Sequence, residues 1–189
     1  MGSGNQAAYG GGVRADDVDL IVSTSIFADN TATSEGGGLY IDDVDGWLIN
    51  TVVAGNSAPS AAGISLRSLD EFQVVNTIVS ANLDGAGVAV SGAAPSIWRH
   101  NDVYGNDAGD YTGMTDPTGT DGNLSADPGF VDAGTGDYQL QSASACVDSG
   151  IPEILDPDGS TSDMGAFGGP HGSWEAPSSS WAARLHTAW

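Results

Sequence analysis

The sequence predicts an all-β fold, a parallel β-solenoid, on three observations: two markers that recur with one period, short strand-like runs, and many turn residues. The first marker is the last glycine of a small-residue run, which recurs in steps of 26, 25 and 24 residues at Gly12, Gly38, Gly63 and Gly87. The second marker is an asparagine, which recurs in steps of 25, 26, 26 and 24 residues at Asn5, Asn30, Asn56, Asn82 and Asn106. Two independent markers with one period indicate coils of about 24–26 residues that stack on one another.

Each coil holds short runs with β-branched residues and alternating polarity, bounded by Gly, Asn and Asp, as is typical of strands and turns. Aligned on the asparagines, residue pairs share one register at 26–27, 52–53, 78–79 and 102–103. Four residues earlier lies an apolar column: Val22, Leu48, Val74 and Trp98. Between this apolar column and the residue pairs lies a polar column: Thr24, Asn50, Asn76 and His100. No helical periodicity separates the runs, which disfavours βαβ units and a horseshoe of leucine-rich repeats with helices.

The repeat then ends, and the chain divides into three parts. Residues 1–106 are the predicted coils, and residues 107–170 are predicted to be irregular closing coils of the same solenoid, with short strands at 129–131 and 138–140. Residues 171–189 form a tail in which serines precede an Ala-rich stretch, a signal for the start of a helix. We expect a short amphipathic helix that covers the last coil or docks a partner through one face: Trp181, Leu185 and Trp189.

Composition and charge exclude several classes of function. Four arginines and no lysine stand against 25 acidic residues, so the formal net charge is −21. Nucleic-acid binders and proteins held electrostatically on anionic lipid need basic patches, so both classes are excluded. No apolar run approaches the roughly 20 residues that insertion into a membrane requires. The single cysteine, Cys146, cannot form an intrachain disulfide, and we expect it to be a small buried hydrophobe.

Two short motifs resemble those of a known class of repeat. Residues 36–39 (GGGL) and 27–30 (FADN) resemble the GGA-[ILV] and FxxN pairs of polymorphic outer-membrane-protein repeats. The whole array is similar to right-handed parallel β-helix (pectate-lyase-like) proteins of bacterial surfaces, and residues 106–170 resemble a segment that often closes such arrays. The resemblance implies a right-handed parallel β-helix at an extracellular or cell-surface location. Activity does not follow from it, because related coils serve lyases, hydrolases, adhesins and passengers alike.

The N-terminal coil is predicted to present an open edge. Asn5 already closes a coil, and no cap is visible before Gly10. Because the terminal coil of a solenoid leaves its strand edges unpaired, we expect upstream coils of a larger surface protein, or another chain, to stack on this end.

Two groups of acidic residues are candidate Ca²⁺ ligands. The first group repeats one coil apart, and stacking would bring its like charges to about 5 Å from one another unless a cation or solvent intervenes. Its members are Asp16, Asp17, Asp42 and Asp43, and Arg67 lies one further step along, where it could neutralise Asp42. The second group surrounds a glycine turn: Asp156, Asp158, Ser160 and Asp163. For the first group a solvated acidic turn is favoured over a bound ion, whereas for the second group capping of backbone amides and a bound ion explain the pattern equally well.

No catalytic residues are predicted. The repeated asparagines, and Asn50 above Asn76, are expected to form structural amide ladders. A polysaccharide lyase would need a basic proton abstractor, and only Arg14, Arg67 and Arg99 lie in the coils. We therefore expect a non-catalytic extracellular structural or adhesive solenoid that binds a glycan or a cell-surface protein, with Ca²⁺ as a candidate ion. The alternative is a polysaccharide lyase or glycoside hydrolase of the pectate-lyase-like fold.

Overall fold

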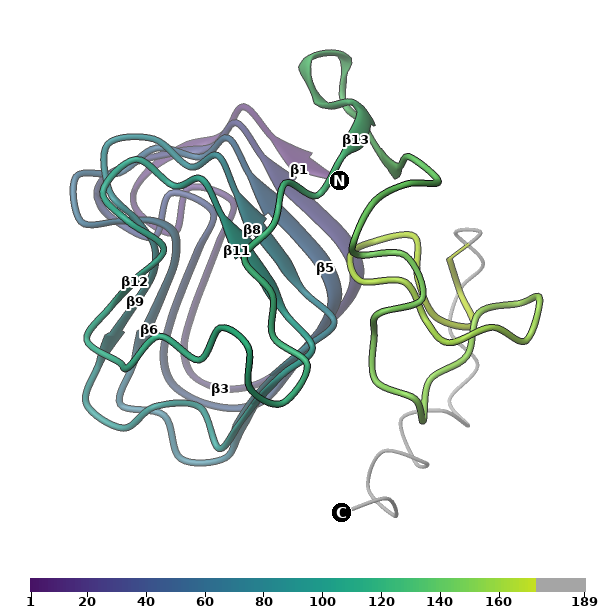
Figure 1. Ribbon diagram of the computed structural model, residues 1–189. Coiled ribbons are helices and arrows are strands. Elements are labelled where there is room, and N and C mark those ends of the chain that lie inside the picture. Colours follow the sequence, from purple (N-terminus) through teal and green to yellow (C-terminus); the bar gives the residue numbers. More distant parts are fainter. Residues whose placement is uncertain (173–189) are drawn as a thin grey trace.

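The computed structural model describes residues 1–172, which form a parallel β-solenoid with an irregular arm at its side (Figure 1). The strands and the short 3₁₀-helix are β1 (Gly2–Ser3), β2 (Gln6–Tyr9), β3 (Val13–Ala28), β4 (Thr31–Glu35), β5 (Leu39–Ala54), β6 (Ala61–Arg67), β7 (Phe72–Val75), β8 (Ile78–Ser80), β9 (Ala86–Ser91), β10 (Ile97–Arg99), β11 (Asp102–Tyr104), β12 (Tyr111–Thr112), β13 (Phe130–Asp132), η1 (Ala133–Thr135) and β14 (Asp137–Leu140). The described part of the chain contains no helix long and apolar enough to cross a membrane. The predicted tail helix with Trp181, Leu185 and Trp189 lies outside the described residues.

The predicted register between coils is confirmed. β3 pairs in parallel with β5 along its whole length, and β5 pairs in turn with β6, β7 and β8. Within these pairings Val22 lies beside Leu48, Leu48 beside Val74, and Val74 beside Trp98. Equivalent residues of successive coils therefore stack in columns, as the steps between the markers predicted.

The core lies inside the coils. Leu39, Ile64 and Val88 form one inward column, and each is fully buried. Further inward columns join it in a continuous apolar core that runs the length of the solenoid. A single coil could not bury these side chains alone, so the stacking of coils stabilises the fold.

The repeated glycines allow close approach between coils. A Cβ at Gly38 would lie 2.6 Å from Cγ1 of Val53 and 2.8 Å from the carbonyl oxygen of Gly63. Any larger residue would therefore push adjacent coils apart. Close approach, rather than a left-handed corner, explains this column, because its glycines are not among the residues with positive φ.

Residues 107–125, here called the end cap, cover the last coil. β12 pairs in parallel with β9, the backbone N–H of Val88 donates to the carbonyl of Asp110, and that of Val103 donates to the carbonyl of Leu124. The end cap thus continues the solenoid by one irregular turn and satisfies the edge of the fourth coil.

Residues 126–170, here called the side arm, do not continue the coils but pack against their outer face (Figure 1). β13 and β14 form an antiparallel hairpin close to the strands predicted at 129–131 and 138–140. Tyr138, Cys146 and Met164 of the side arm bury the outward side chains of Ile26 and Val52. Because Phe27, Val53 and Val79 fill the inside, this part of the first three coils is apolar on both faces.

Candidate functional site

The repeated asparagines form a continuous ladder from Asn5 to Asn106. At each rung the backbone N–H and the side-chain Nδ2 of one asparagine donate to Oδ1 of the next, over 2.8–3.1 Å. From Asn30 onward each Nδ2 also donates to a backbone carbonyl of the preceding coil, as Asn82 does to Val53 at 3.1 Å. These side chains satisfy buried backbone groups between coils, so their role is structural.

The column of Asn50 and Asn76 has a different role from the ladder, because it bonds to the side arm. The bond that joins the two amides is long, at 3.4 Å, and both residues have left-handed backbone at a corner between strands. Their main partners lie in the side arm: Nδ2 of Asn50 donates to Oγ of Ser162 at 3.1 Å, and Oδ1 of Asn76 accepts the N–H of Ile151 at 2.8 Å. His100, the next residue of the column, bonds the carbonyl of Ser149 at 3.0 Å. This column anchors the side arm and is only secondarily an amide ladder.

The first acidic group lies at the surface of the first two coils. Asp16 lies beside Asp42 in paired strands, but Asp16 is bonded to Arg14 at 2.8 Å. Asp42 accepts the hydroxyl of Tyr40 at 3.1 Å and lies 3.7 Å from Nε of Arg67, so the predicted neutralisation by Arg67 is confirmed. The other two members of the first acidic group, Asp17 and Asp43, are exposed corner residues with left-handed backbone.

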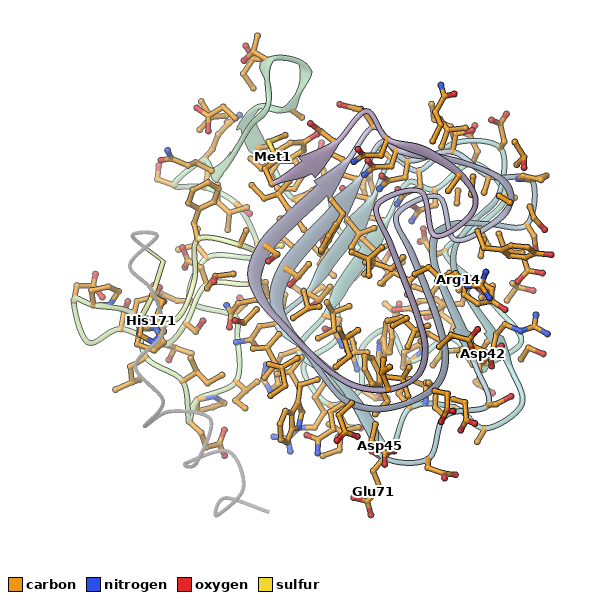
Figure 2. The ribbon with its side chains drawn as sticks, turned by 180° about the vertical axis from the view of Figure 1, so that it is seen from behind. Met1, Arg14, Asp42, Asp45, Glu71 and His171 are labelled. Carbon is orange, nitrogen blue, oxygen red and sulfur yellow. The ribbon has the colours of Figure 1, made fainter. Side chains whose placement is uncertain are left out.

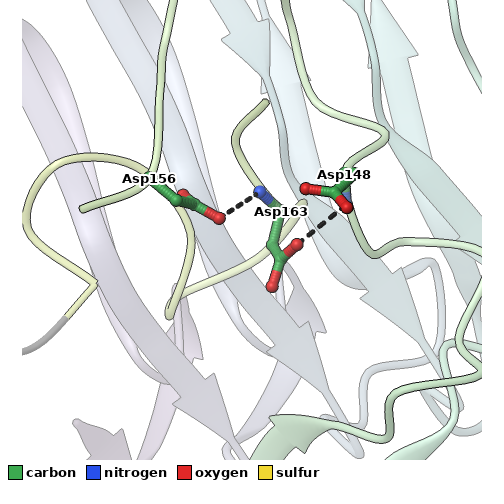
Figure 3. A group of neighbouring side chains, drawn as sticks. All are labelled: Asp148, Asp156 and Asp163. Carbon is green, nitrogen blue, oxygen red and sulfur yellow. Dashed lines mark hydrogen bonds between the residues drawn. The ribbon is translucent and has the colours of Figure 1, made fainter. Parts of the chain in front are cut away.

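The second acidic group is partly assembled in the side arm. One carboxylate oxygen from each of Asp148, Asp156 and Asp163 lies within 4.8 Å of the others (Figure 3), and these three could hold a metal ion. The carboxylates already cap the backbone: Asp156 accepts the N–H groups of Asp163, at 3.1 Å, and Gly169, and Asp163 accepts the N–H of Asp148 at 2.8 Å. Burial raises the pKa of both Asp156 and Asp163.

Two of the predicted ligands stay apart from this cluster. The backbone N–H and the hydroxyl of Ser160 donate to the carboxylate of Asp158, at 2.9 and 2.6 Å. These bonds lower the pKa of Asp158, and they form a local turn within the loop. Asp148 takes the third place in the cluster, which the spacing of the glycine turn did not predict because Asp148 precedes that turn by several residues.

An aromatic and charged patch, here called the Tyr/Arg surface, lies on the outer side of β2, β3, β4, β5 and β6 and consists of Tyr9, Arg14, Glu35, Tyr40, Asp42 and Arg67. Its aromatic half joins Tyr9 and Tyr40 edge to face, with ring centroids 5.1 Å apart. The guanidinium of Arg14 lies 5.6 Å from the centroid of each ring. Figure 2 shows Arg14 and Asp42 on the same side of the coils.

The charged half of the Tyr/Arg surface is centred on Arg67. Its guanidinium lies 3.2 Å from Glu35 and 3.7 Å from Asp42, and Ser65 donates to Glu35 at 3.1 Å. Burial alone lowers the pKa of Arg67, but the neighbouring Tyr40 and Glu35 outweigh it and raise the pKa. Burial, together with the bond to Asp42, raises the pKa of the Tyr40 hydroxyl. Both groups therefore keep their protons at neutral pH.

A buried carboxylate lies under the side arm. Asp102 occupies the outward column that holds Ile78 in the preceding coil, and it is fully buried. Its carboxylate accepts the N–H of Ala126 at 2.9 Å and the thiol of Cys146 at 3.4 Å. Burial, with a smaller contribution from the charge of Asp110, outweighs the hydrogen bonds from Ala126 and Cys146 and raises the pKa of Asp102 to about 6. The sequence placed this residue in its register, but its burial depends on the side arm.

Comparisons with known proteins give a family but no individual relative. No curated protein and no solved structure matches the chain. One family model matches, and it is neither that of polymorphic outer-membrane-protein repeats nor that of pectate-lyase-like proteins. The resemblance to those two classes therefore stays a prediction. The matching model is described as disaggregatase related and covers residues 41–161, from β5 into the side arm and more than half of the sequence. The chain thus belongs to the disaggregatase-related family.

Proposed function

We propose that this protein is a non-catalytic, extracellular solenoid that binds glycan chains through the Tyr/Arg surface. The observation that carries the proposal is the clustering of two tyrosines, two arginines and two carboxylates on one side of three stacked coils. The family name refers to a disaggregating activity, and a protein that binds glycans at a cell surface is compatible with that name.

Sugar rings present an apolar face and a rim of hydroxyl groups, and the Tyr/Arg surface offers partners for both. Tyr9 is 39 % exposed and supplies an aromatic face of the kind that packs against apolar ring surfaces. Arg14 and Arg67 supply N–H donors, while Glu35 and Asp42 supply carboxylate acceptors. Stacked strands hold these groups in fixed positions, which lowers the entropy cost of binding.

The state of Arg67 favours binding over bond cleavage. The polysaccharide lyase alternative needs a basic residue that gives up its proton in order to accept another from the substrate. Tyr40, Glu35 and Asp42 stabilise the protonated guanidinium, and the pKa of Arg67 is raised. Arg67 is therefore suited to donate hydrogen bonds to a ligand, not to abstract a proton.

Glycan binding can be tested with an immobilised panel of neutral and acidic polysaccharides, with Ca²⁺ or a chelator present. We expect Tyr9→Ala to weaken binding about tenfold, the loss of roughly 1.4 kcal/mol of contact energy. Tyr104→Ala is the matched control, because Tyr104 is 40 % exposed on the fourth coil and lies outside the Tyr/Arg surface.

The panel distinguishes the alternatives. Absence of binding to every polysaccharide contradicts the proposal and leaves a protein partner as the ligand. Equal loss in Tyr9→Ala and Tyr104→Ala places the contact elsewhere on the molecule. Release of shortened or unsaturated sugars, monitored by absorbance and chromatography, would instead support the alternative of a polysaccharide lyase or glycoside hydrolase.

A further inference from the structure

The arginines of the Tyr/Arg surface are already paired with carboxylates. Nη2 of Arg14 lies 2.8 Å from Asp16, and the guanidinium of Arg67 lies 3.2 Å from Glu35 and 3.7 Å from Asp42. Two guanidinium groups thus face three carboxylates, so the charge of these five groups together is negative. Neither arginine presents an uncompensated positive charge to a ligand.

Arg67, Glu35 and Asp42, here called the Arg67 cluster, lie within the array of coils and not at its end. β5, which carries Asp42, pairs with β3 on one side and with β6 on the other, and β6, which carries Arg67, pairs in turn with β9. The side chains of Arg67, Glu35 and Asp42 are 36, 26 and 27 % exposed. Because coils cover the cluster on both sides, its exposed atoms face outward, where a ligand can reach them.

The Arg67 cluster keeps both a donor and acceptors open to a ligand. Oε2 of Glu35 accepts from Ser65 and Arg67, and Oδ2 of Asp42 accepts from Tyr40 and faces Nε of Arg67. No donor among residues 1–172 bonds the second oxygen of either carboxylate, and no acceptor among them bonds Nη2 of Arg67. The open atoms are therefore one N–H group and two carboxylate oxygens.

Open atoms of this kind are complementary to hydroxyl groups. A hydroxyl both donates and accepts, so it can bond the N–H of Arg67 and a neighbouring carboxylate oxygen at once. A uronate or sulfate group only accepts, and it would bring its negative charge close to Glu35 and Asp42. The rest of the chain adds to this repulsion, because the net charge is −21 and no lysine is present.

We infer that the Tyr/Arg surface selects uncharged glycans over those with uronate or sulfate groups, and that Glu35 sets this preference. The inference rests on the proposed glycan binding and names its class of ligand. Glu35 forms the shorter of the two contacts with Arg67 and is also bonded by the hydroxyl of Ser65 at 3.1 Å. Without the charge of Glu35, Arg67 faces Asp42 alone at 3.7 Å and can pair with an anionic group of a ligand.

The preference can be measured with pairs of polysaccharides that share one backbone and differ in charge. Each acidic member of the immobilised panel is compared with its own methyl ester, and each neutral member with its carboxymethyl derivative, at low ionic strength with a chelator present. We expect the protein to bind the uncharged member of a pair about tenfold more tightly or better, because like charges oppose binding of the other. Added salt should reduce the difference, since it screens that repulsion.

Glu35→Gln keeps the size of the side chain and an acceptor for Ser65 while it removes the negative charge. We expect this variant to bind the charged member of each pair about tenfold more tightly than the parent does, because Arg67 can then pair with the ligand. Asp132→Asn, at an exposed position of β13, makes the same change in net charge away from the Tyr/Arg surface and should leave the preference unchanged. Circular dichroism checks that both variants keep the fold.

The outcomes separate this inference from the proposed function. If the charged member of a pair binds as tightly as the uncharged one, glycan binding stands and the inferred selectivity is wrong. If Glu35→Gln and Asp132→Asn change the preference equally, the total charge of the protein sets it, and the role of Glu35 is refuted. Absence of binding to every polysaccharide refutes the proposed function and the inference with it.

Discussion

The two ends of the asparagine ladder differ, although the coils that carry them follow one repeat. At the C-terminal end Asn106 donates its backbone N–H, at 3.3 Å, and its Nδ2, at 2.9 Å, to Oδ1 of Asp110. An aspartate of the end cap thus takes the place of the next asparagine. At the N-terminal end Asn5 is exposed, and none of residues 1–172 donates to its Oδ1. The repeat fixes the positions of the ladder asparagines. The closure of an end requires residues outside the repeat, as Asp110 shows for Asn106.

The largest expected effect separates a middle rung from the open end. Asn82→Ala removes the acceptor for the N–H of Asn56 and the donor to the carbonyl of Val53, and both groups are buried. Each buried polar group left without a partner costs about 1–3 kcal/mol, so we expect Asn82→Ala to lower the free energy of unfolding by about 4 kcal/mol. Asn5→Ala should cost less than about 1 kcal/mol, because solvent can replace its bonds.

Urea unfolding, followed by circular dichroism and tryptophan fluorescence, measures both variants. Equal losses in Asn82→Ala and Asn5→Ala would mean that the ladder contributes the same at its open end as in its middle. The comparison between the ends would then be wrong. A change in the denaturant slope would instead indicate that the coils unfold in separate steps.

The stacking of coils could be predicted because it depends on spacing alone. A one-for-one register carries Val22 onto Leu48 and Arg67 beside Asp42, and no knowledge of the rest of the chain is needed. The Tyr/Arg surface was only half predicted. Tyr9 reaches Glu35 through β2 and β4, whose pairing shifts register between Ala7 and Tyr9, and a strict repeat cannot show such a shift.

The side arm is the part that sequence reasoning could not place. Its contacts join residues far apart in sequence, such as Asn50 with Ser162, and its strands follow no period. The role of Asn50 as an anchor, the burial of Asp102 and the place of Asp148 in the acidic cluster all depend on it. A second asparagine column was also missed: Asn101 accepts from the N–H of Thr77 at 2.9 Å, and its own N–H donates to Oδ1 of Asn123 in the end cap at 3.1 Å.

The second prediction concerns the charge buried at the covered end. The pKa of Asp102 is about 6 in the folded protein, against 3.8 for its ordinary value, so the folded state binds more protons between these two values. Stability from this group is therefore complete below about pH 4 and is lost as pH rises through 6. The full loss is about 3 kcal/mol, from roughly 2.2 pKa units at 1.36 kcal/mol each.

Asp102→Asn removes the titration while it keeps an acceptor for the N–H of Ala126. We expect the variant to unfold at higher urea concentration than the parent at pH 8 and at nearly the same concentration at pH 4. Asp19→Asn, at an exposed position of the open end, is the control for the change in net charge. If the urea midpoints of both variants depend on pH in the same way, burial under the side arm does not raise the pKa of Asp102.

The third prediction, with a smaller expected loss than Asn82→Ala and the titration of Asp102, tests how the end cap closes the ladder. Asp110→Ala removes the acceptor for two donors of Asn106, and Asp110 itself is only partly buried, so we expect a loss of about 1–2 kcal/mol in the free energy of unfolding. Asp110→Asn keeps Oδ1 and should restore most of that stability, because the ladder asparagines use the same atom in every inner rung. Hydrogen exchange of β9 and β11 should quicken in the alanine variant alone. Should Asp110→Ala leave both measurements unchanged, the pairing of Val88 and Val103 with the end cap would suffice to close this end, and the aspartate would contribute nothing to it.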